Sequence, residues 1–314
     1  MRILFMGTPD FAVPTLRALY ESGEEIIGVV TQPDKPRGRG YVMTPPPVKV
    51  YAEEKGLPVF QPQTLRDGSF DGTLTELAPE LIVVVAYGKL LPKTVLEAPP
   101  YGCINVHGSL LPALRGAAPM QRAIIDGLDV TGVTTMYMAE GMDTGDMLLR
   151  TEVPITEEDD FGTIHDKMAA AGAALLLDTV AALKDGSLRR IPQDDALATH
   201  AAEIEKADCL LDFDRPVKAV FDRVRGLSPA PLAFTHTPDG KLLKVVSARR
   251  GSTTPPDCPP GSVLSLDGSS GGGIEVACAD GSLWLTRVVP EGKSAMAAAD
   301  YLRGRRLTVG DILK

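Results

Sequence analysis

The sequence has few cysteines and no long apolar run. Its four cysteines, at positions 103, 209, 258 and 278, form no C-x-x-C pair and have no histidine at metal-ligand spacing, so we expect reduced, structural thiols and no metal site. The longest apolar stretch, LIVVVAYG from Leu81, is far too short to cross a bilayer. The chain opens without the charged and apolar regions of a secretory signal, so we expect a cytoplasmic protein without a membrane anchor.

Signatures for binding cofactor phosphates are also absent. A single glycine, Gly7, follows the first apolar segment, where a dinucleotide-binding fold has the three glycines of G-x-G-x-x-G. No Walker A sequence occurs in the chain. The sequence therefore gives no support to a dinucleotide cofactor or to a P-loop nucleotide site.

The net charge of −9 is unevenly distributed along the chain. Residues 208–314 hold 14 Lys and Arg against 12 Asp and Glu, a balance of +2, whereas residues 1–207 hold 18 against 29, a balance of −11. The relatively basic C-terminal part permits a polyanionic partner, although charge alone does not prove one.

Hydrophobic periodicity predicts an α/β fold in the first half of the chain. The pattern indicates a buried strand at residues 2–6, a helix at 10–21 and a second strand at 26–31. These elements form a βαβ unit, which builds a parallel sheet with right-handed crossovers. The continuous apolar run at residues 81–86 predicts a central strand that is covered on both faces.

A chain of 314 residues is longer than one hydrophobic core usually sustains, so two domains are expected. A long amphipathic helix is predicted at residues 161–185, after which the periodicity breaks. Beyond residue 208, short β-prone segments separated by turn clusters predict a small OB-like β-barrel. We predict a Rossmann-like, mostly parallel sheet domain at residues 1–189, a linker at 190–207 and the barrel domain at 208–314.

The candidate site lies in the segment GCINVHGSLLPALRGAAPMQR, which starts at Gly102. In residues 103–107 apolar and polar side chains alternate, which predicts a strand whose two faces differ. Asn105 and His107 then share one face, about 6.5 Å apart along the strand. A tight turn follows, and a later loop rich in glycine and aspartate carries Asp143.

These three polar residues suggest catalysis. A carboxylate on a loop near a strand-end histidine commonly fixes the tautomer and charge of the imidazole. A histidine alone on a strand is more often structural, but the combination of Asn105, His107 and Asp143 favours a catalytic site. Ser109 suggests a serine hydrolase instead, yet its neighbours do not form the G-x-S-x-G elbow, which argues against a nucleophilic serine.

Five motifs, in register along the chain, resemble one enzyme family. They are LFMGTPDFAVPTL from residue 4, TQPDKPRGRG from residue 31, NVHGSLLP from residue 105, RGAAP from residue 115 and GMDTGDM from residue 141. Together they resemble the formyltransferases that use 10-formyltetrahydrofolate, and the two N-terminal motifs resemble the branch that acts on aminoacyl-tRNA. The resemblance runs from residue 1 to about residue 207 and continues more weakly to the C-terminus.

The resemblance implies transfer of the formyl group of 10-formyltetrahydrofolate to the α-amine of methionyl-initiator tRNA, for translation initiation. Asn105 is then suited to donate to the oxyanion, and His107 to polarise the formyl oxygen or to relay the amine proton. Asp143 would orient or charge the imidazole. A covalent step is unnecessary, because the carrier already presents an activated formyl group.

The resemblance also implies two binding regions. The folate donor is expected to contact Tyr87, Gly88, Leu90, Ser109, Leu110, Leu111 and Pro112. The long loop at residues 32–47 is expected to enter the tRNA acceptor stem, with Lys35, Arg37 and Arg39 as tRNA-binding residues. From the residues alone, ordinary packing of Tyr87 is as compatible with the sequence as a ligand contact. For the loop, composition alone also leaves a solvated tether open, as the less favoured alternative.

Other functions stay open at this point. A sugar-nucleotide formyltransferase or a formyltetrahydrofolate hydrolase could share Asn105, His107 and Asp143, while the basic loop and the predicted barrel favour tRNA. A nucleic-acid-binding protein on an inactive α/β scaffold would not need these three residues. Since no exposed apolar repeat suggests a partner subunit, we expect a monomer.

Overall fold

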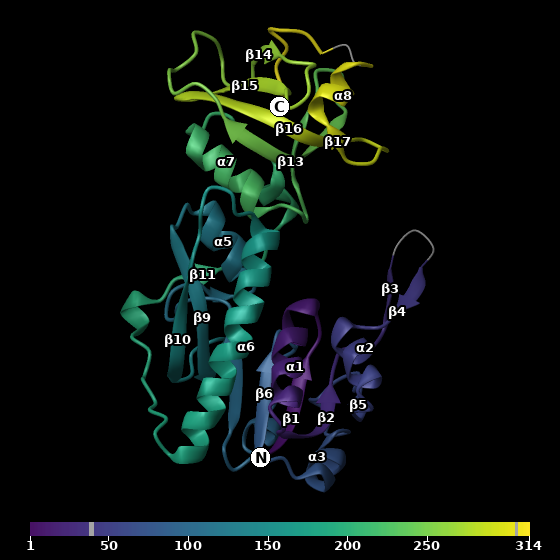
Figure 1. Cartoon of the computed structure of the whole chain (residues 1–314), viewed down its shortest axis with the longest axis vertical. Helices are drawn as coiled ribbons and strands as arrows, with labels where there is room; N and C mark the ends of the chain where they lie inside the picture. The colour runs from purple at the N-terminus through teal and green to yellow at the C-terminus, as the bar shows by residue number, and fades with distance from the viewer. Residues whose placement is uncertain (38–40, 305–306) are drawn as a thin grey trace. The chain divides into compact units, whose positions relative to one another are not determined.

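The computed structural model describes residues 1–37, 41–304 and 307–314, which form two compact units (Figure 1). The first unit consists of residues 1–116, 131–154 and 165–201, and the second of residues 117–130, 155–164 and 202–314. Two short segments, residues 117–130 and 155–164, therefore belong to the same unit as the C-terminal part.

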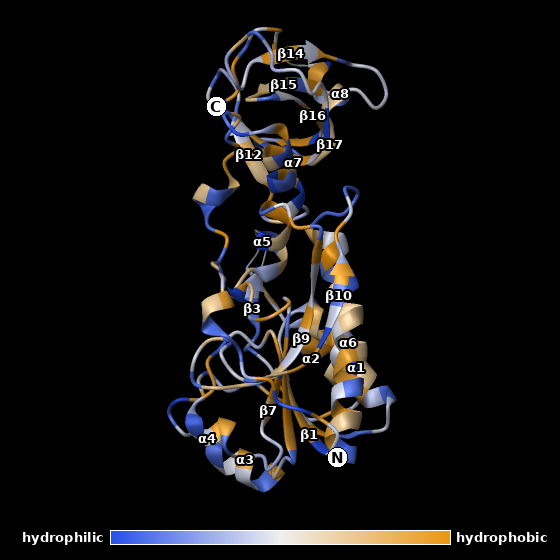
Figure 2. Ribbon diagram, turned by 90° about the vertical axis from the view of Figure 1, so that its left-hand side faces the viewer, coloured by the Kyte–Doolittle hydropathy of each residue, from blue (hydrophilic) through white to orange (hydrophobic). Residues whose placement is uncertain are grey.

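A seven-stranded sheet organises the first unit. In spatial order it contains β10 (Met147–Pro154), β9 (Val130–Tyr137), β7 (Cys103–His107), β6 (Leu81–Val85), β1 (Arg2–Gly7), β2 (Glu25–Val30) and β5 (Val59–Phe60). The strands from β7 to β5 are parallel, and β9 pairs antiparallel with β7. This arrangement confirms the predicted Rossmann-like, mostly parallel sheet. Every residue of β6 is buried, as expected for a central parallel strand, and Figure 2 shows the strands around β1 and β7 in the orange of hydrophobic residues.

Helices pack against this sheet. They are η1 (Asp10–Ala12), α1 (Val13–Glu21), α2 (Pro47–Glu54), α3 (Asp71–Leu77), α4 (Lys93–Leu96) and α6 (Phe161–Asp185). Buried side chains of α3 and α4 join those of β1 and β6 in one hydrophobic cluster. On α6, Gly172 allows a close approach to the sheet, because a Cβ atom there would lie 2.9 Å from Val106 Cγ1.

The sequence explains both ends of α6. Asp160 and Thr163 form a reciprocal cap: the Asp160 carboxylate accepts from the Thr163 N–H at 2.9 Å, and the Thr163 hydroxyl accepts from the Asp160 N–H at 3.0 Å. Alanine and leucine, which favour helix, fill much of the interior. Gly186 follows with a φ of 76°, the left-handed conformation that commonly ends helices.

The predicted loop at residues 32–47 contains a small hairpin. Strands β3 (Lys35–Arg37) and β4 (Val42–Thr44) pair antiparallel, with Lys35 opposite Thr44. Arg39 lies outside the described residues. Sequence patterns did not predict this hairpin, because prolines and glycines interrupt the alternation that identifies strands.

The segment after α6, predicted as the beginning of a linker, pairs with other parts of the first unit. Ile191 exchanges two backbone hydrogen bonds of 2.9 Å with Met147. Farther on, β11 (His200–Ala201) pairs in parallel with β8 (Arg115–Gly116), and the 3-10 helix η2 (Asp195–Leu197) lies between these contacts in the sequence. We call residues 191–201 the strap.

An antiparallel sheet forms the core of the second unit. Its strands are β12 (Ala233–His236), β13 (Leu242–Arg250), β16 (Gly281–Pro290), β15 (Ile274–Cys278) and β14 (Val263–Leu266), in that order, and β17 (Met296–Ala297) pairs with β16. The helical elements are α5 (Pro119–Ile125), η3 (Lys206–Cys209), α7 (Val217–Gly226) and α8 (Ala298–Leu302). Gly226 of α7 lies so close to α5 that a Cβ atom would be 2.6 Å from Ile125 Cγ1.

The C-terminal residues connect the two edges of this sheet. Lys314 exchanges two backbone hydrogen bonds with His236, the last residue of β12. At the other edge, the Val263 N–H of β14 donates to the Asp311 carbonyl at 2.7 Å, and the Leu313 N–H donates to the Gly261 carbonyl at 2.9 Å. Residues 311–314 thus link β12 to β14, in agreement with the predicted OB-like barrel.

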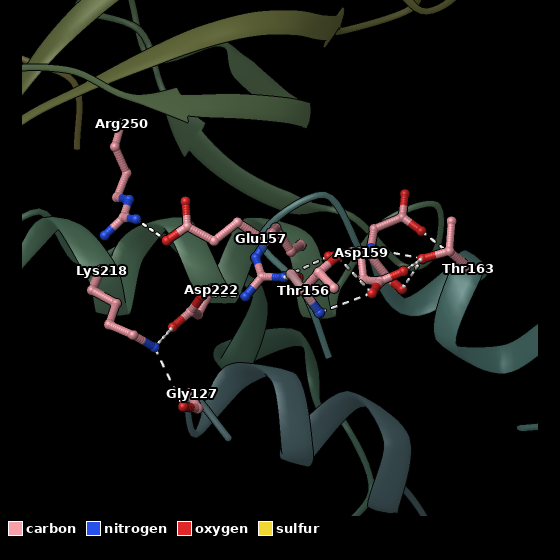
Figure 3. Close-up of polar contacts among 10 residues, drawn as sticks. Gly127, Thr156, Glu157, Asp159, Thr163, Lys218, Asp222 and Arg250 are labelled. Carbon is pink, nitrogen blue, oxygen red and sulfur yellow. Dashed lines mark hydrogen bonds and ion pairs between the residues drawn. The ribbon is translucent and has the colours of Figure 1, made fainter. Parts of the chain in front are cut away.

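A buried carboxylate on α7 explains how the end of α5 is held in the second unit (Figure 3). Asp222 is 2% exposed, and its oxygens accept from Lys218 Nζ at 2.7 Å and from Arg225 Nη2 at 2.6 Å. The Lys218 ammonium also donates to the carbonyl of Gly127, at 3.3 Å. The Asp222 carboxylate therefore binds two cationic side chains, and one of them, Lys218, contacts the turn after α5.

The other cation holds the turn before α6. Arg225 Nη1 donates to the carbonyls of Thr156 and Asp159, at 2.7 and 2.6 Å. Arg250 forms an ion pair with Glu157 of the same turn, as Figure 3 also shows. These contacts bring the 155–164 segment into the second unit.

The cysteines agree with the expectation of free, structural thiols. All four are free, and Cys103, Cys209 and Cys278 are buried. Burial raises the pKa of the Cys103 thiol to about 12, so this side chain packs as a small neutral group. No described helix is long and apolar enough to cross a membrane.

Candidate active site

The candidate residues lie near the carboxyl edge of the parallel sheet, where open α/β folds bind ligands. Strand β7 lies between β6 and β9, with Asn105 opposite Val84 on one side and Met136 on the other. The Asn105 side chain is partly exposed and has no hydrogen-bond partner among the described residues. Its amide is therefore available to a ligand.

His107 ends β7 and is 6% exposed. Its Nε2 lies 3.1 Å from the carbonyl oxygen of Leu114, and because a carbonyl can only accept, Nε2 carries the hydrogen. In the neutral ring the lone pair is then on Nδ1, which lies 3.6 Å from Asp143 Oδ2. A proton gained at Nδ1 would lie toward the Asp143 carboxylate.

Asp143 belongs to the loop between β9 and β10 and has a φ of 53°, in the left-handed region. Its Oδ2 accepts from the backbone N–H of Gly116 at 2.8 Å. Gly116 itself has a φ of 120°, and a Cβ atom there would lie 2.8 Å from the Ala201 carbonyl oxygen. The structure thus brings Asp143 to His107, as the sequence predicted, and Gly116 links the carboxylate to the strap.

The turn after β7 is held by its own polar groups. The Ser109 side chain is fully buried, and its hydroxyl donates to the carbonyl of Ala113 at 2.6 Å. Thr134 of β9 bridges the turn, because its hydroxyl donates to the Ser109 carbonyl and accepts from the Leu111 N–H. Ser109 is therefore engaged in shaping the turn, which agrees with the argument against a nucleophilic serine. Sequence reasoning did not identify Thr134, since a threonine in a strand carries no motif.

The expected folate contacts differ in how accessible they are. The Tyr87 ring is 2% exposed within a hydrophobic cluster, and burial raises the pKa of its hydroxyl to about 12. Its carbonyl accepts from Thr8 Oγ1 and Gln32 Nε2, both at 3.0 Å. Tyr87 thus packs and positions the segment, whereas Leu90 is 53% exposed and Gly88 is exposed with a φ of 82°.

The remaining expected folate residues follow β7. Leu111 is fully buried, while Leu110 and Pro112 are partly exposed. Together with Gly88 and Leu90, they leave apolar side chains and glycine backbone uncovered near the carboxyl edge, which suits the flat ring system of a folate.

Two of the three expected tRNA contacts lie on β3, and Arg39 lies outside the described residues. Lys35 is exposed on β3, and the backbone of Arg37 ends that strand. The pKa of Lys89 is lowered, mainly by burial and to a smaller extent by the positive charge of Lys35. The Lys89 ammonium donates to the carbonyls of Pro62 and Gln63, so it ties the segment after β6 to the segment after β5.

Three further residues support the site and were not predicted from sequence. Gln193 donates to the carbonyls of Asp143 and Gly145, Arg115 donates to Gln193, and Thr199 Oγ1 accepts from the Leu114 N–H at 2.8 Å. None belongs to a periodic pattern that sequence reasoning could use. Among the described residues, no group of three or more His, Cys, Asp or Glu side chains could hold a metal ion.

Comparison with known proteins covers nearly the whole chain. Residues 1–180 match the formyl transferase domain family, and residues 203–306 match the formyl transferase C-terminal domain family. The methionyl-tRNA formyltransferase of Bacillus licheniformis is 48% identical over 310 residues, covering 98% of this chain and 96% of that protein. The methionyl-tRNA formyltransferase of Citrifermentans bemidjiense is 49% identical over 313 residues, covering 100% and 96%.

Solved structures share the fold at lower identity. HypX from Aquifex aeolicus in complex with tetrahydrofolic acid matches with a TM-score of 0.65 and 19% identity, covering 96% of this chain and 47% of HypX. An N-formyltransferase from Helicobacter canadensis, in complex with folinic acid and dTDP-3-aminofucose, matches with a TM-score of 0.67 and 15% identity, covering 90% and 98%. These likenesses concern the arrangement of the chain.

Proposed function

Because this chain belongs to the methionyl-tRNA formyltransferase family, we propose that it transfers the formyl group of 10-formyltetrahydrofolate to the α-amine of methionyl-initiator tRNA. The similarity covers 96% of each of the two relatives named above, both halves included. The observation that supports the mechanism is the position of His107 between the Leu114 carbonyl and the Asp143 carboxylate. Two residues away, the Asn105 amide has no hydrogen-bond partner in the part of the chain that the structure describes.

The reaction is a direct attack of the amine on the formyl carbon, without a covalent bond to the enzyme. The neutral α-amine forms a bond to that carbon, which gives a tetrahedral intermediate with a negatively charged oxygen. The bond from the carbon to N10 of the folate then breaks. The amine loses one proton and N10 gains one, so the products are N-formylmethionyl-tRNA and tetrahydrofolate.

Asn105 stabilises the intermediate. Its partly exposed amide lacks a partner among the described residues, so its N–H can be directed at the developing oxyanion. One donor of this kind is worth about a hundredfold to a thousandfold in rate. An amide already occupied by the protein could not contribute in this way.

His107 and Asp143 handle the amine proton. Since Nε2–H is engaged with Leu114, the ring accepts the proton at Nδ1, and the nearby Asp143 carboxylate stabilises the resulting charge. The distance of 3.6 Å between Nδ1 and Oδ2 is longer than a hydrogen bond, and such pairs often tighten when reactants bind. The Gly116 N–H keeps the carboxylate at this position.

The substrates bind on either side of this unit. The uncovered surfaces of Gly88, Leu90, Leu110 and Pro112 contact the folate, and the buried Tyr87, Ser109 and Leu111 shape that surface. The tRNA contacts proposed from the resemblance are Lys35, Arg37 and Arg39, whose positive charges suit the phosphates of the acceptor stem. Of these, Lys35 is exposed on β3.

Catalysis and tRNA affinity belong to different parts of the chain. Residues 1–189 supply the chemistry, residues 208–314 add affinity for tRNA, and residues 190–207 join them, with the strap also packing in the first unit. The protein acts as a monomer in the cytoplasm, where charged tRNA is found.

One assay with two acceptors and an acceptor-free control tests the function. The purified chain is incubated with 10-formyltetrahydrofolate and either charged initiator tRNA, a nucleotide-linked amino sugar or no acceptor, and formyl products and free formate are measured. We expect rapid formylation of the charged tRNA alone. Rapid formylation of the sugar, or equal formate release without acceptor, would contradict the proposal and indicate a sugar formyltransferase or a hydrolase.

A further inference from the structure

The side chain of Gln193 connects the two loops that carry the candidate site. Its Nε2 donates to the carbonyls of Asp143 and Gly145, both at 2.7 Å. Its Oε1 accepts from Arg115 Nε at 3.0 Å. Both amide hydrogens and the carbonyl oxygen are thus engaged, and the residue comes from the strap, about fifty positions from the Asp143 loop.

These contacts complete a ring of hydrogen bonds around Asp143. The Asp143 carboxylate is held by the N–H of Gly116, and the Asp143 carbonyl is held, through Gln193, by the side chain of Arg115. Two adjacent residues, Arg115 and Gly116, therefore hold the backbone carbonyl and the side-chain carboxylate of Asp143, Arg115 through Gln193 and Gly116 directly. Arg115 is 5% exposed, so its own position is well determined by packing.

The conformation of the loop makes this control necessary. Asp143 adopts a left-handed φ of 53°, which is uncommon for a residue with a side chain and is retained only where the surroundings specify it. Gly145 is equally constrained, since a Cβ atom there would lie 1.8 Å from the Tyr137 carbonyl oxygen. Gln193 bonds to the carbonyls of both residues.

We propose that Gln193 is a positioning residue for formyl transfer, which holds the Asp143 loop so that Oδ2 faces His107. This inference rests on the proposed role of Asp143 in catalysis. The three side-chain hydrogen bonds of Gln193 go to Asp143, Gly145 and Arg115, so its effect passes through the aspartate. Because a displacement of about 1 Å at a catalytic group can cost about a hundredfold, loss of the amide should lower kcat by about 10-fold to 100-fold, with little change in KM for the folate.

Two substitutions separate positioning from simple packing. Gln193→Ala removes all three hydrogen bonds. Gln193→Glu keeps the length and gives Arg115 an ionic partner, but its carboxylate cannot donate to the Asp143 and Gly145 carbonyls. If Gln193 only satisfied Arg115, the glutamate would restore activity. We expect instead that both variants are slow and that the glutamate variant unfolds at a temperature near that of the wild type.

Asp195→Ala is the matched control. Asp195 also pairs with Arg115, through Nη2 at 2.8 Å, but its side chain is 85% exposed. Within the described residues it forms no hydrogen bond with Asp143. Its replacement should leave kcat within about twofold of the wild type. A comparable loss in this variant would assign the effect to Arg115 rather than to the Asp143 loop, and would overturn the proposal.

A double-mutant cycle with Asp143→Asn completes the test. Residues that act through one another do not have multiplicative effects, so Gln193→Ala should slow the Asp143→Asn enzyme by less than about threefold. If Asp143→Asn is slow while both Gln193 variants keep wild-type kcat, the positioning role is wrong and the proposed function stands. If Asp143→Asn itself keeps wild-type kcat, the catalytic role of Asp143 fails and the role of Gln193 fails with it.

Discussion

Replacing Asp222 by Asn should destabilise the second unit by about 3–5 kcal/mol, the usual cost of removing one partner from a buried ion pair. The substitution keeps the volume of the side chain but removes the charge between Lys218 and Arg225. The Arg225 side chain is 11% exposed, so water cannot replace the lost carboxylate. The new amide nitrogen would also face a cationic donor where an oxygen previously accepted.

The expected change in melting temperature follows from the size of the unit. The second unit has about 140 residues, and an unfolding entropy of about 2.1 cal/mol/K per residue gives about 0.3 kcal/mol/K for the unit. A loss of 3–5 kcal/mol should then lower its Tm by about 10–17 °C.

The fluorescence of Trp284 provides the assay, because it is the single tryptophan of the chain and lies on β16 of the second unit. Lys218→Ala is the control: the Lys218 side chain is 55% exposed, and an exposed ion pair is worth at most about 1 kcal/mol. Its Tm should fall by no more than about 3 °C. A similarly small shift for Asp222→Asn would refute the argument that burial makes this carboxylate important.

Three further predictions concern the site and the surface. Asn105→Ala should lower kcat by about a hundredfold to a thousandfold, and His107→Ala by as much or more. The Kd for the folate, measured by titration, should stay the same in both variants. Near-normal turnover of a folded His107→Ala enzyme would contradict the role of this histidine. Lys35→Ala should raise KM for charged tRNA and reduce the slope of log affinity against log salt by about 1, and an unchanged slope would remove Lys35 from the tRNA contacts. A thiol reagent at pH 8 should modify the partly exposed Cys258 first, because burial raises the pKa of Cys103 to about 12. Mass spectrometry would measure the rate at each cysteine, and equal rates would show that Cys103 is accessible.

The secondary structure was most predictable where one local pattern dominates. The alternation in residues 103–107 and the helical pattern in residues 161–185 correspond to β7 and α6 with the observed bounds. Both patterns depend only on neighbouring residues and on which face is buried. The hairpin of β3 and β4 was missed because its strands have three residues each, too few to show a period, and because prolines and glycines interrupt the surrounding pattern.

The candidate site was predictable in part. The placement of Asn105 and His107 on one strand follows from a period of two, and the motif around Asp143 indicated a loop that could reach the histidine. The hydrogen bond from His107 to Leu114 was not predictable, because it requires a left-handed φ of 57° at Leu114, which no residue type there signals. The tautomer of the imidazole therefore became clear only in the folded chain.

The sequence by itself determined the parallel sheet, the strand with Asn105 and His107, and the likeness to one enzyme family, because periodicity and motifs are local properties. Only the tertiary structure decided that residues 117–130 and 155–164 belong with the C-terminal part, and that Gln193 of the strap holds the Asp143 loop. These features depend on the burial of one carboxylate, Asp222, and on hydrogen bonds between residues about fifty or more positions apart. The free energy of such contacts depends on how completely water is excluded around each group, and that exclusion exists only once the chain has folded.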